Sequence, residues 1–257
     1  MTYQVEKIIK QKIKENKLSK ENFAFFYYNL ENKETYFYSK EKWFIGASTT
    51  KVQIAMIYYE MIKDKKVNEK DMYLYKENHY EAGNGIITNE YKVGDKIPLK
   101  KLLYEMIVNS DNTATNILAE ALGGRKIYRK YFEKYTKTTL PDEFYTENII
   151  SASYGLDVLK YLYKNSNIYK ELIENMKKSS FGKYLKKYIS SCEIAHKYGS
   201  YKGNIHDYGI VYGKKTYFIG IFTKNIENAE ELIATISKEI FEKAQSLQIR
   251  YTKKSKF

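Results

Sequence analysis

The sequence predicts an α+β fold in which both chain ends build one antiparallel sheet and the middle forms an all-helical lobe. Strand-like runs occur near the beginning and again near the end, whereas the residues between them have helical periodicity. The chain has 257 residues, of which 43% are hydrophobic, so it can bury a sizeable core. We expect an α/β lobe from residues 1–45 and 192–257 and a helical lobe from residues 46–191, together forming one domain.

The first elements are an amphipathic helix and a hairpin. Apolar residues recur at helical spacing at Val5, Ile8 and Ile9, which predicts a helix over residues 3–15. Two runs rich in aromatic residues follow, at 23–30 and 35–39, and a polar turn separates them. These runs are expected to pair as neighbouring strands.

The middle of the chain is helical in character, and strands return near the end. Six helices are expected, with Gly123 and Gly124 closing the third of them: 49–62, 99–108, 113–122, 126–135, 153–164 and 168–178. Three strands and a last helix are then expected: 193–198, 208–212, 216–223 and 228–247. Two lobes of this kind leave a cleft between them.

The charge and composition narrow the classes of partner. The net charge of +13 would attract anionic partners. The lysines are spread along the chain, however, which favours a solvated lysine-rich surface. The 28 tyrosines alternate within strand-like runs, which favours sheet packing over base stacking. Because no nucleic-acid-binding motif is visible, no nucleic acid is expected as a partner.

Several other classes are excluded by what the sequence contains. No apolar run reaches the roughly 18 to 20 residues that cross a bilayer, so no membrane span is expected. Cys192 is the single cysteine, so an internal disulfide framework is impossible. The histidines, His79, His196 and His206, are scattered, so we expect no metal site and no cofactor.

Ser48 and Lys51 form the first pair that could carry chemistry. They stand three residues apart where a loop gives way to a helix, so the lysine amine can approach the serine hydroxyl. A neighbouring amine with a lowered pKa can accept the serine proton and activate the oxygen as a nucleophile. The alternative is a helix cap at Ser48 beside a solvated Lys51.

Two further short motifs follow. Ser110-Asp111-Asn112 begins a helical segment, where an ordinary N-terminal cap is the alternative reading. Lys197-Tyr198-Gly199-Ser200 ends a strand, where the lysine could hold an anionic group and the glycine would allow close backbone approach. Taken alone, this last motif could be a basic strand that leads into a turn.

In this order, the three motifs resemble the signature set of the class A β-lactamases and penicillin-binding proteins, a serine hydrolase family. The likeness extends over nearly the whole chain and is weakest at residues 125–191. It also includes these stretches: 44–52, 83–87, 103–124 and 194–223. The resemblance implies the β-lactamase/DD-peptidase fold.

The resemblance also implies roles for individual residues. Ser48 would be the acylated nucleophile and Lys51 the group that helps to deprotonate it. Ser110 would pass a proton to the leaving nitrogen, and Asn112 would bind the substrate's amide side chain. Lys197 would bind the substrate carboxylate. The backbone N–H groups of Ser48 and Ser200 would form the oxyanion hole, beside Gly199.

Two departures from the family pattern affect the expected activity. Tyr198 stands where the family has threonine, so a ring could narrow the cleft, although Ser200 offers a hydroxyl nearby. The family's loop that activates the hydrolytic water, with its Glu-x-x-x-Asn pattern, is truncated here, and no acid between residues 140 and 151 has asparagine four residues on. Glu143 and Glu147 are the candidate replacements, with a solvated polar loop as the alternative.

We therefore expect a serine hydrolase that opens β-lactam bonds through a Ser48 acyl-enzyme and deacylates slowly. The alternatives are a penicillin-binding DD-peptidase-like enzyme, an esterase or amidase, and a β-lactam-binding sensor without turnover. The expected partner is a small β-lactam or a peptide-like acyl donor, and the expected state is a monomer. A native start at Met1 would indicate the cytoplasm, whereas a removed leader would indicate secretion or the cell surface.

Overall fold

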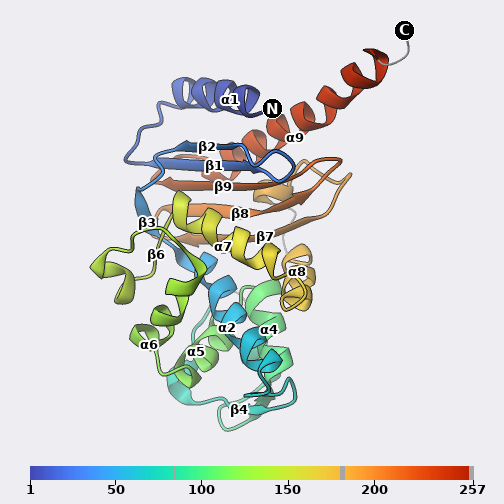
Figure 1. The fold of residues 1–257 in the computed structure, drawn as a ribbon. Coiled ribbons are helices and arrows are strands. Elements are labelled where there is room, and N and C mark those ends of the chain that lie inside the picture. The colour runs from blue at the N-terminus through green and yellow to red at the C-terminus, as the bar shows by residue number, and fades with distance from the viewer. Residues whose placement is uncertain (84, 180–182, 255–257) are drawn as a thin grey trace. The chain divides into compact units, whose positions relative to one another are not determined.

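The computed structural model describes residues 1–83, 85–179 and 183–254, which fall into two compact units (Figure 1). Unit 1 comprises Met1–Thr49, Ile149–Leu159 and Phe181–Phe257, and unit 2 comprises Thr50–Asn148 and Lys160–Ser180. The expected lobes had different bounds, since residues 149–159 were grouped with the helical part. Their place in unit 1 follows from a strand and a helix start that pack with the sheet.

A five-stranded antiparallel sheet forms the centre of unit 1. Its order is β2-β1-β9-β8-β7, so strands from both ends of the chain meet where β1 pairs with β9. The strands are β1 (Phe23–Asn29), β2 (Thr35–Tyr38), β7 (Ile194–Tyr201), β8 (Asn204–Tyr212) and β9 (Thr216–Lys224). This confirms the α+β class and the sheet assembled from both chain ends.

Strand β1 is buried along its whole length because both of its faces are covered. Phe25 and Tyr27 belong to the hydrophobic cluster on one face. Phe26 points to the other face, where its ring lies 6.2 Å from that of Phe222. Gly220 of β9 pairs with Phe26, and a Cβ at this glycine would lie only 2.1 Å from the phenylalanine ring. The glycine therefore makes room for an aromatic residue in the centre of the sheet.

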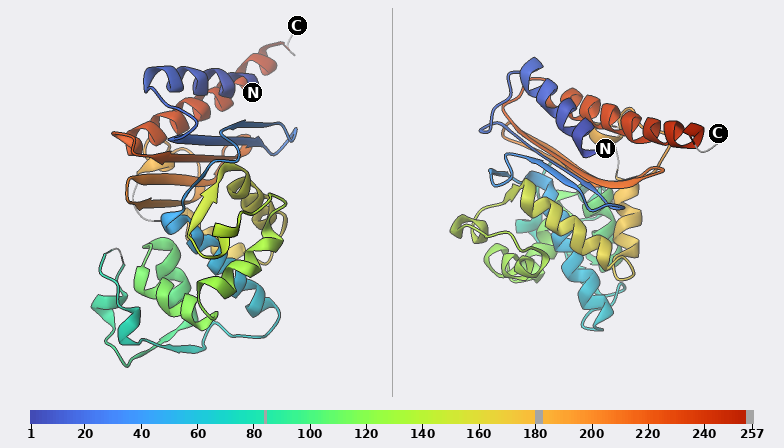
Figure 2. Two further views of the ribbon diagram at one scale, coloured as in Figure 1. Left: turned by 90° about the vertical axis from the view of Figure 1, so that its left-hand side faces the viewer. Right: turned by 45° about the horizontal axis from the view of Figure 1, so that its top comes forward.

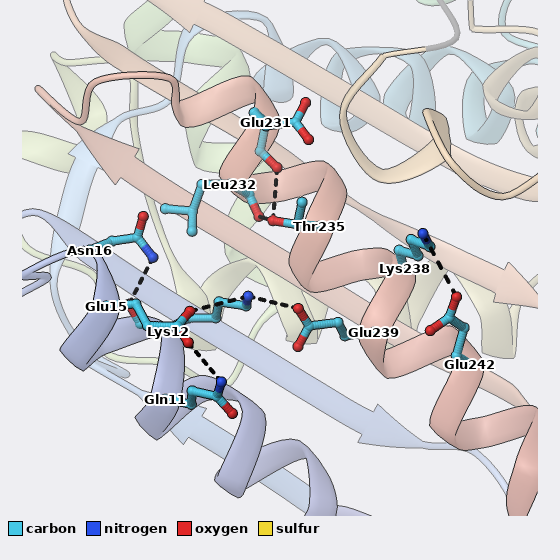
Figure 3. Close-up of polar contacts among 10 residues, drawn as sticks. All are labelled: Gln11, Lys12, Glu15, Asn16, Glu231, Leu232, Thr235, Lys238, Glu239 and Glu242. Carbon is cyan, nitrogen blue, oxygen red and sulfur yellow. Dashed lines mark hydrogen bonds and ion pairs between the residues drawn. The ribbon is translucent and has the colours of Figure 1, made fainter.

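Helices α1 (Thr2–Glu15) and α9 (Ala229–Lys254) lie side by side on one face of this sheet (Figure 2). Both contribute aliphatic side chains to the cluster, among them Ile9 and Ile236, which are fully buried. On the polar side, the Lys12 amine lies 2.7 Å from Glu239 and 3.3 Å from Glu15, so it joins the two helices (Figure 3).

The opposite face of the sheet carries a two-stranded ribbon and the start of α7 (Ala152–Lys164). Strands β3 (Trp43–Ile45) and β6 (Ile149–Ser151) form the ribbon. Gly155 of α7 packs against the sheet, where an added Cβ would lie 3.2 Å from Phe222. These contacts bring residues 149–159 into unit 1.

Unit 2 is mainly helical. Its helices are α2 (Lys51–Lys63), α3 (Ile87–Glu90), α4 (Leu99–Val108), α5 (Asn112–Ala121), α6 (Arg125–Tyr131) and α8 (Lys170–Lys177). Strands β4 (Met72–Leu74) and β5 (Lys96–Pro98) form a short ribbon that was not expected from the sequence. Helix α2 is buried from Lys51 to Tyr59 and forms the core of the unit. Within the described residues, no helix combines the length and apolar character needed to cross a bilayer.

Candidate active site

In unit 1, Ser48 lies in a 3-10 turn, Ala47–Thr50, that continues directly into α2. Ala47 has a φ of 48°, in the left-handed region that L-residues rarely adopt. Thr49 secures the turn, because its backbone N–H and its hydroxyl both donate to Gly46 O, at 3.1 and 2.5 Å. Strain of about 1–3 kcal/mol held in place by such contacts is typical of functional positions.

Two side chains of β8 hold the segment around Ser48. Tyr208 donates its hydroxyl proton to Thr49 O at 3.3 Å, and His206 Nε2 donates to Ile45 O at 2.8 Å. Burial lowers the pKa of His206 to about 4, so the ring is neutral and Nδ1 accepts from the N–H of Thr223. Sequence reasoning missed both residues as anchors, although their i, i+2 spacing places them on one face of the strand.

Gly199 brings strand β7 against the Ser48 turn. A Cβ at Gly199 would lie 2.9 Å from Ser48 N, 3.0 Å from Ala47 Cβ and 3.1 Å from Gly46 O. A side chain is excluded here, so the close backbone approach expected from the sequence is present. β7 is an edge strand of the five-stranded sheet, so the backbone groups on its outer side have no strand partner in that sheet.

Lys197 and Tyr198 are both buried in unit 1. The Tyr198 ring stacks on Tyr184, with centroids 5.0 Å apart and planes at 13°, and it belongs to the hydrophobic cluster. The Lys197 amine lies 4.4 Å from the centre of the Tyr198 ring and donates to Tyr198 O at 3.4 Å. Tyr198 therefore takes part in core packing and in a cation–π contact with the lysine.

In unit 2, three groups surround the Lys51 amine. It donates to Ser110 O at 2.7 Å, to Asn112 Oδ1 at 2.7 Å and to Ser110 Oγ at 3.3 Å. Ser110 has a φ of 55°, which turns both its carbonyl and its hydroxyl toward the lysine. Lys51 is 3% exposed, so the alternative of a solvated lysine does not hold. The structure brings Lys51, Ser110 and Asn112 together.

Burial lowers the pKa of Lys51 to about 7, although the carboxylates of Asp111 and Glu81 act in the opposite direction. A substantial fraction of the amine is therefore neutral near neutral pH. Ser110 O and Asn112 Oδ1 can only accept protons, whereas Ser110 Oγ can also donate. A neutral Lys51 can thus keep both short contacts and accept from the Ser110 hydroxyl.

Asp111 combines capping with loop attachment. Its carboxylate accepts from Ala114 N at 2.7 Å, which caps α5, and from Ile87 N at 2.9 Å. Gly85 fits against it, because a Cβ there would lie 2.0 Å from Asp111 Oδ2. The cap reading of the Ser-Asp-Asn motif is therefore correct, and the same motif also holds Lys51. Asn84, in the same loop, lies outside the described residues.

The two loop acids, Glu143 and Glu147, are exposed. Glu143 lies in the 3-10 turn Asp142–Tyr145, and Glu147 follows two residues after it. Helix α6 holds this segment, because Arg129 stacks on Phe144 at 4.1 Å and Arg125 donates to Thr146 O. The exposure fits a solvated polar loop, which was the alternative interpretation. Elsewhere, residues 1–83, 85–179 and 183–254 contain no group of three or more His, Cys, Asp or Glu side chains arranged to hold a metal ion.

A sequence model of the group described as "Beta-lactamase enzyme family" matches residues 4–244. Among solved structures, a PBP-A mutant in an acyl-enzyme complex with penicillin G has a TM-score of 0.82 and 18% identity, covering 93% of this chain and 97% of that one. A β-lactamase from Chitinophaga pinensis has a TM-score of 0.81 and 19% identity, covering 94% and 99%.

The TLA-1 extended-spectrum β-lactamase gives a TM-score of 0.79 at 19% identity, covering 93% of this chain and 98% of that one. No curated protein sequence matches the chain. At 18–19% sequence identity the solved structures establish the fold, and the match to the sequence model establishes the family.

Proposed function

This chain belongs to the β-lactamase enzyme family and is class A-like, and from that premise we propose that it hydrolyses β-lactam bonds through an acyl-enzyme on Ser48. Family membership supports a serine hydrolase with a small-molecule substrate. The assignment of β-lactams and of individual residue roles is our proposal.

The observation that carries the proposal is the state of Lys51. An ordinary lysine is protonated at neutral pH and cannot accept a proton. Here the amine is buried between Ser110 and Asn112, and its pKa falls to about 7. A general base works best when its pKa lies near the working pH. Lys51, three residues after Ser48, therefore has a pKa that suits a general base at neutral pH.

The reaction follows from these groups. Neutral Lys51 accepts the Ser48 hydroxyl proton as Oγ attacks the lactam carbonyl carbon, and negative charge develops on the carbonyl oxygen. The N–H groups of Ser48 and Ser200 donate to that oxygen; each such donor contributes about 3–4 kcal/mol in known cases. The C–N bond then breaks, and Ser110 passes its proton to the leaving nitrogen while protonated Lys51, which donates to Ser110 Oγ, replaces it. Lys197 binds the substrate carboxylate.

Deacylation is the slow step in this proposal. Hydrolysis of the ester on Ser48 requires a group that deprotonates water, and the loop at residues 140–151 lacks the family's Glu-x-x-x-Asn pattern. Glu143 and Glu147 are solvated candidates for that role. The acyl-enzyme therefore persists. The PBP-A neighbour, whose structure is an acyl-enzyme complex with penicillin G, offers a parallel.

Intact-mass spectrometry tests the nucleophile. Wild type mixed with benzylpenicillin gains the mass of one penicillin, because the ring opens without loss of atoms. Ser48→Ala gains none, since it removes the hydroxyl of the residue whose N–H lies next to Gly199 in the strained turn. An adduct of equal yield on both proteins would show that Ser48 is not the nucleophile.

A second candidate function is acyl transfer from another donor, as in a DD-peptidase-like enzyme, an esterase or an amidase. Tyr198, which replaces the family's threonine hydroxyl with a ring packed on Tyr184, favours a different acyl donor. Steady-state hydrolysis of a chromogenic β-lactam beside a simple ester separates the cases. Many turnovers of the β-lactam support the hydrolase, turnover of the ester alone supports the second candidate, and one burst per chain supports a sensor.

A further inference from the structure

Glu81 is an acidic residue that has no part in the reaction proposed above. Its side chain is exposed, and it lies in the segment that leads from the 3-10 turn at Glu77–His79 toward α3. Although exposed, it is fixed in place. The Asn116 amide donates to Glu81 Oε2 at 2.9 Å and to His79 O at 3.2 Å.

The backbone of Glu81 is also attached to α5. Its N–H donates to Thr113 Oγ1 at 3.1 Å, and the same hydroxyl donates to Glu81 O at 3.4 Å. Thr113 is in the first turn of α5, whose positive end favours a carboxylate nearby. The backbone of Glu81 is therefore held at the helix start, and its carboxylate is held about one turn farther along by Asn116.

Glu81 lies near Asn112. Asn112 and Asn116 are four residues apart on α5, so they share one helix face, about 6 Å apart along the axis. The chain after Glu81 returns toward Asn112, since a Cβ at Gly83 would lie 3.6 Å from Asn112 Nδ2. The carboxylate thus flanks the amide that, in the proposed function, binds the substrate's acylamino group.

The charge of Glu81 also reaches the Lys51 group. Coulombic attraction from Asp111 and Glu81 opposes the effect of burial on the pKa of Lys51. Asp111 is buried, and its two carboxylate oxygens accept hydrogen bonds from Ala114 N and Ile87 N. Glu81 Oε2 accepts from Asn116, and the exposed carboxylate retains further acceptor capacity for a ligand.

We propose that Glu81 is a specificity-determining residue that binds a cationic group, such as an ammonium, on the amide side chain of the acyl donor. The inference rests on the proposed function, because it takes Asn112 as the contact for the substrate amide. A substituent bonded next to that amide lies within reach of the carboxylate on the same face of α5. An exposed ion pair of this kind gives a selectivity of up to about fivefold.

Benzylpenicillin and ampicillin form a matched pair for the test, because they differ by one amino group on the acyl side chain. At about pH 6.5 this amine is protonated. The second-order rate of Ser48 acylation is measured for both compounds in wild type and Glu81→Gln. The ratio of ampicillin to benzylpenicillin is expected to be two- to fivefold higher in wild type. Intrinsic differences between the penicillins cancel when the two ratios are compared.

Three further measurements separate charge recognition from shape. Glu81→Lys is expected to lower the ratio below that of Glu81→Gln, because the ammonium then meets a like charge. Raising the salt concentration to about 1 M should bring the wild-type ratio toward that of Glu81→Gln, since exposed pairs are screened. Glu227→Gln removes the same charge from an exposed position in unit 1 and should keep the wild-type ratio.

The outcomes distinguish this inference from the function on which it rests. Equal ratios in wild type and Glu81→Gln, with both compounds still acylating Ser48, would overturn the role of Glu81 and leave the proposed function standing. Absence of acylation by either compound in wild type would overturn the proposed function itself. A ratio change that salt does not affect would also count against an ionic contact.

Discussion

Lys51 shows how the surroundings of a residue determine its chemistry. Desolvation favours the neutral amine, whereas three oxygen acceptors and two nearby carboxylates favour the ammonium ion. Desolvation is the larger effect, and the pKa falls from 10.5 to about 7. The Ser-x-x-Lys spacing predicted the lysine, but its burial depends on residues some sixty positions later in the chain, which no local pattern specifies.

A pH dependence of acylation follows from this pKa. Only the neutral amine accepts a proton, so the acylation rate should rise tenfold per pH unit below about pH 7 and level off above it. The measurement is the rate of adduct formation with benzylpenicillin across the pH range in which the fold is intact. A rate that still rises between pH 8 and pH 10 would show that Lys51 titrates as an ordinary lysine.

Gly199→Ala tests the approach of β7 to the Ser48 turn. The added Cβ would lie 2.9 Å from Ser48 N, so strand or turn must shift. We expect acylation to slow at least tenfold and the free energy of unfolding to fall by about 1–3 kcal/mol. Both are measured with benzylpenicillin and by urea unfolding. Gly124→Ala is the control, because an added Cβ there is strained by the positive φ but meets no atom within 4 Å. If acylation slowed equally in this control, the steric explanation for Gly199→Ala would be wrong.

At the scale of elements, long periodic segments were predicted well and very short strands were missed. Helix α4 has the predicted bounds, and α1, α5 and α7 begin within one residue of them. Strands β3, β4, β5 and β6 have three residues each, too few for a period-two pattern to stand out. The β3–β6 pair matters because it assigns residues 149–159 to unit 1.

The loop around Asp142–Tyr145 makes a prediction about deacylation. Glu143 and Glu147 are exposed, and Arg129 and Arg125 hold their loop, so neither acid lies in the buried setting that suits a water-activating base. Glu143→Gln and Glu147→Gln should each leave the decay of the penicillin adduct within twofold of wild type, followed by intact mass over hours. Decay slowed tenfold by one substitution would identify that acid as the base.

For the whole molecule, the α+β class and the sheet built from both chain ends were predictable, because strand-like and helical segments are well separated along the sequence. The proposed site was predictable only in part. The motifs supplied Ser48, Lys51 and Ser110, but Glu81 lies outside all three and has no distinctive local pattern. Its attachment to Asn116 arises from tertiary packing, and the i, i+4 relation of Asn116 to Asn112 was the one available hint.

The pairing of β1 with β9 has a consequence for how the protein is made. During translation the first hairpin, β1 with β2, leaves the ribosome long before β9 is synthesised. The backbone groups of β1 that pair with β9 in the folded protein are therefore unpaired at that stage. Phe23, Phe25 and Tyr27 then present aromatic surface that invites aggregation or chaperone binding. Yield in cells should therefore depend on how quickly the final third of the polypeptide follows.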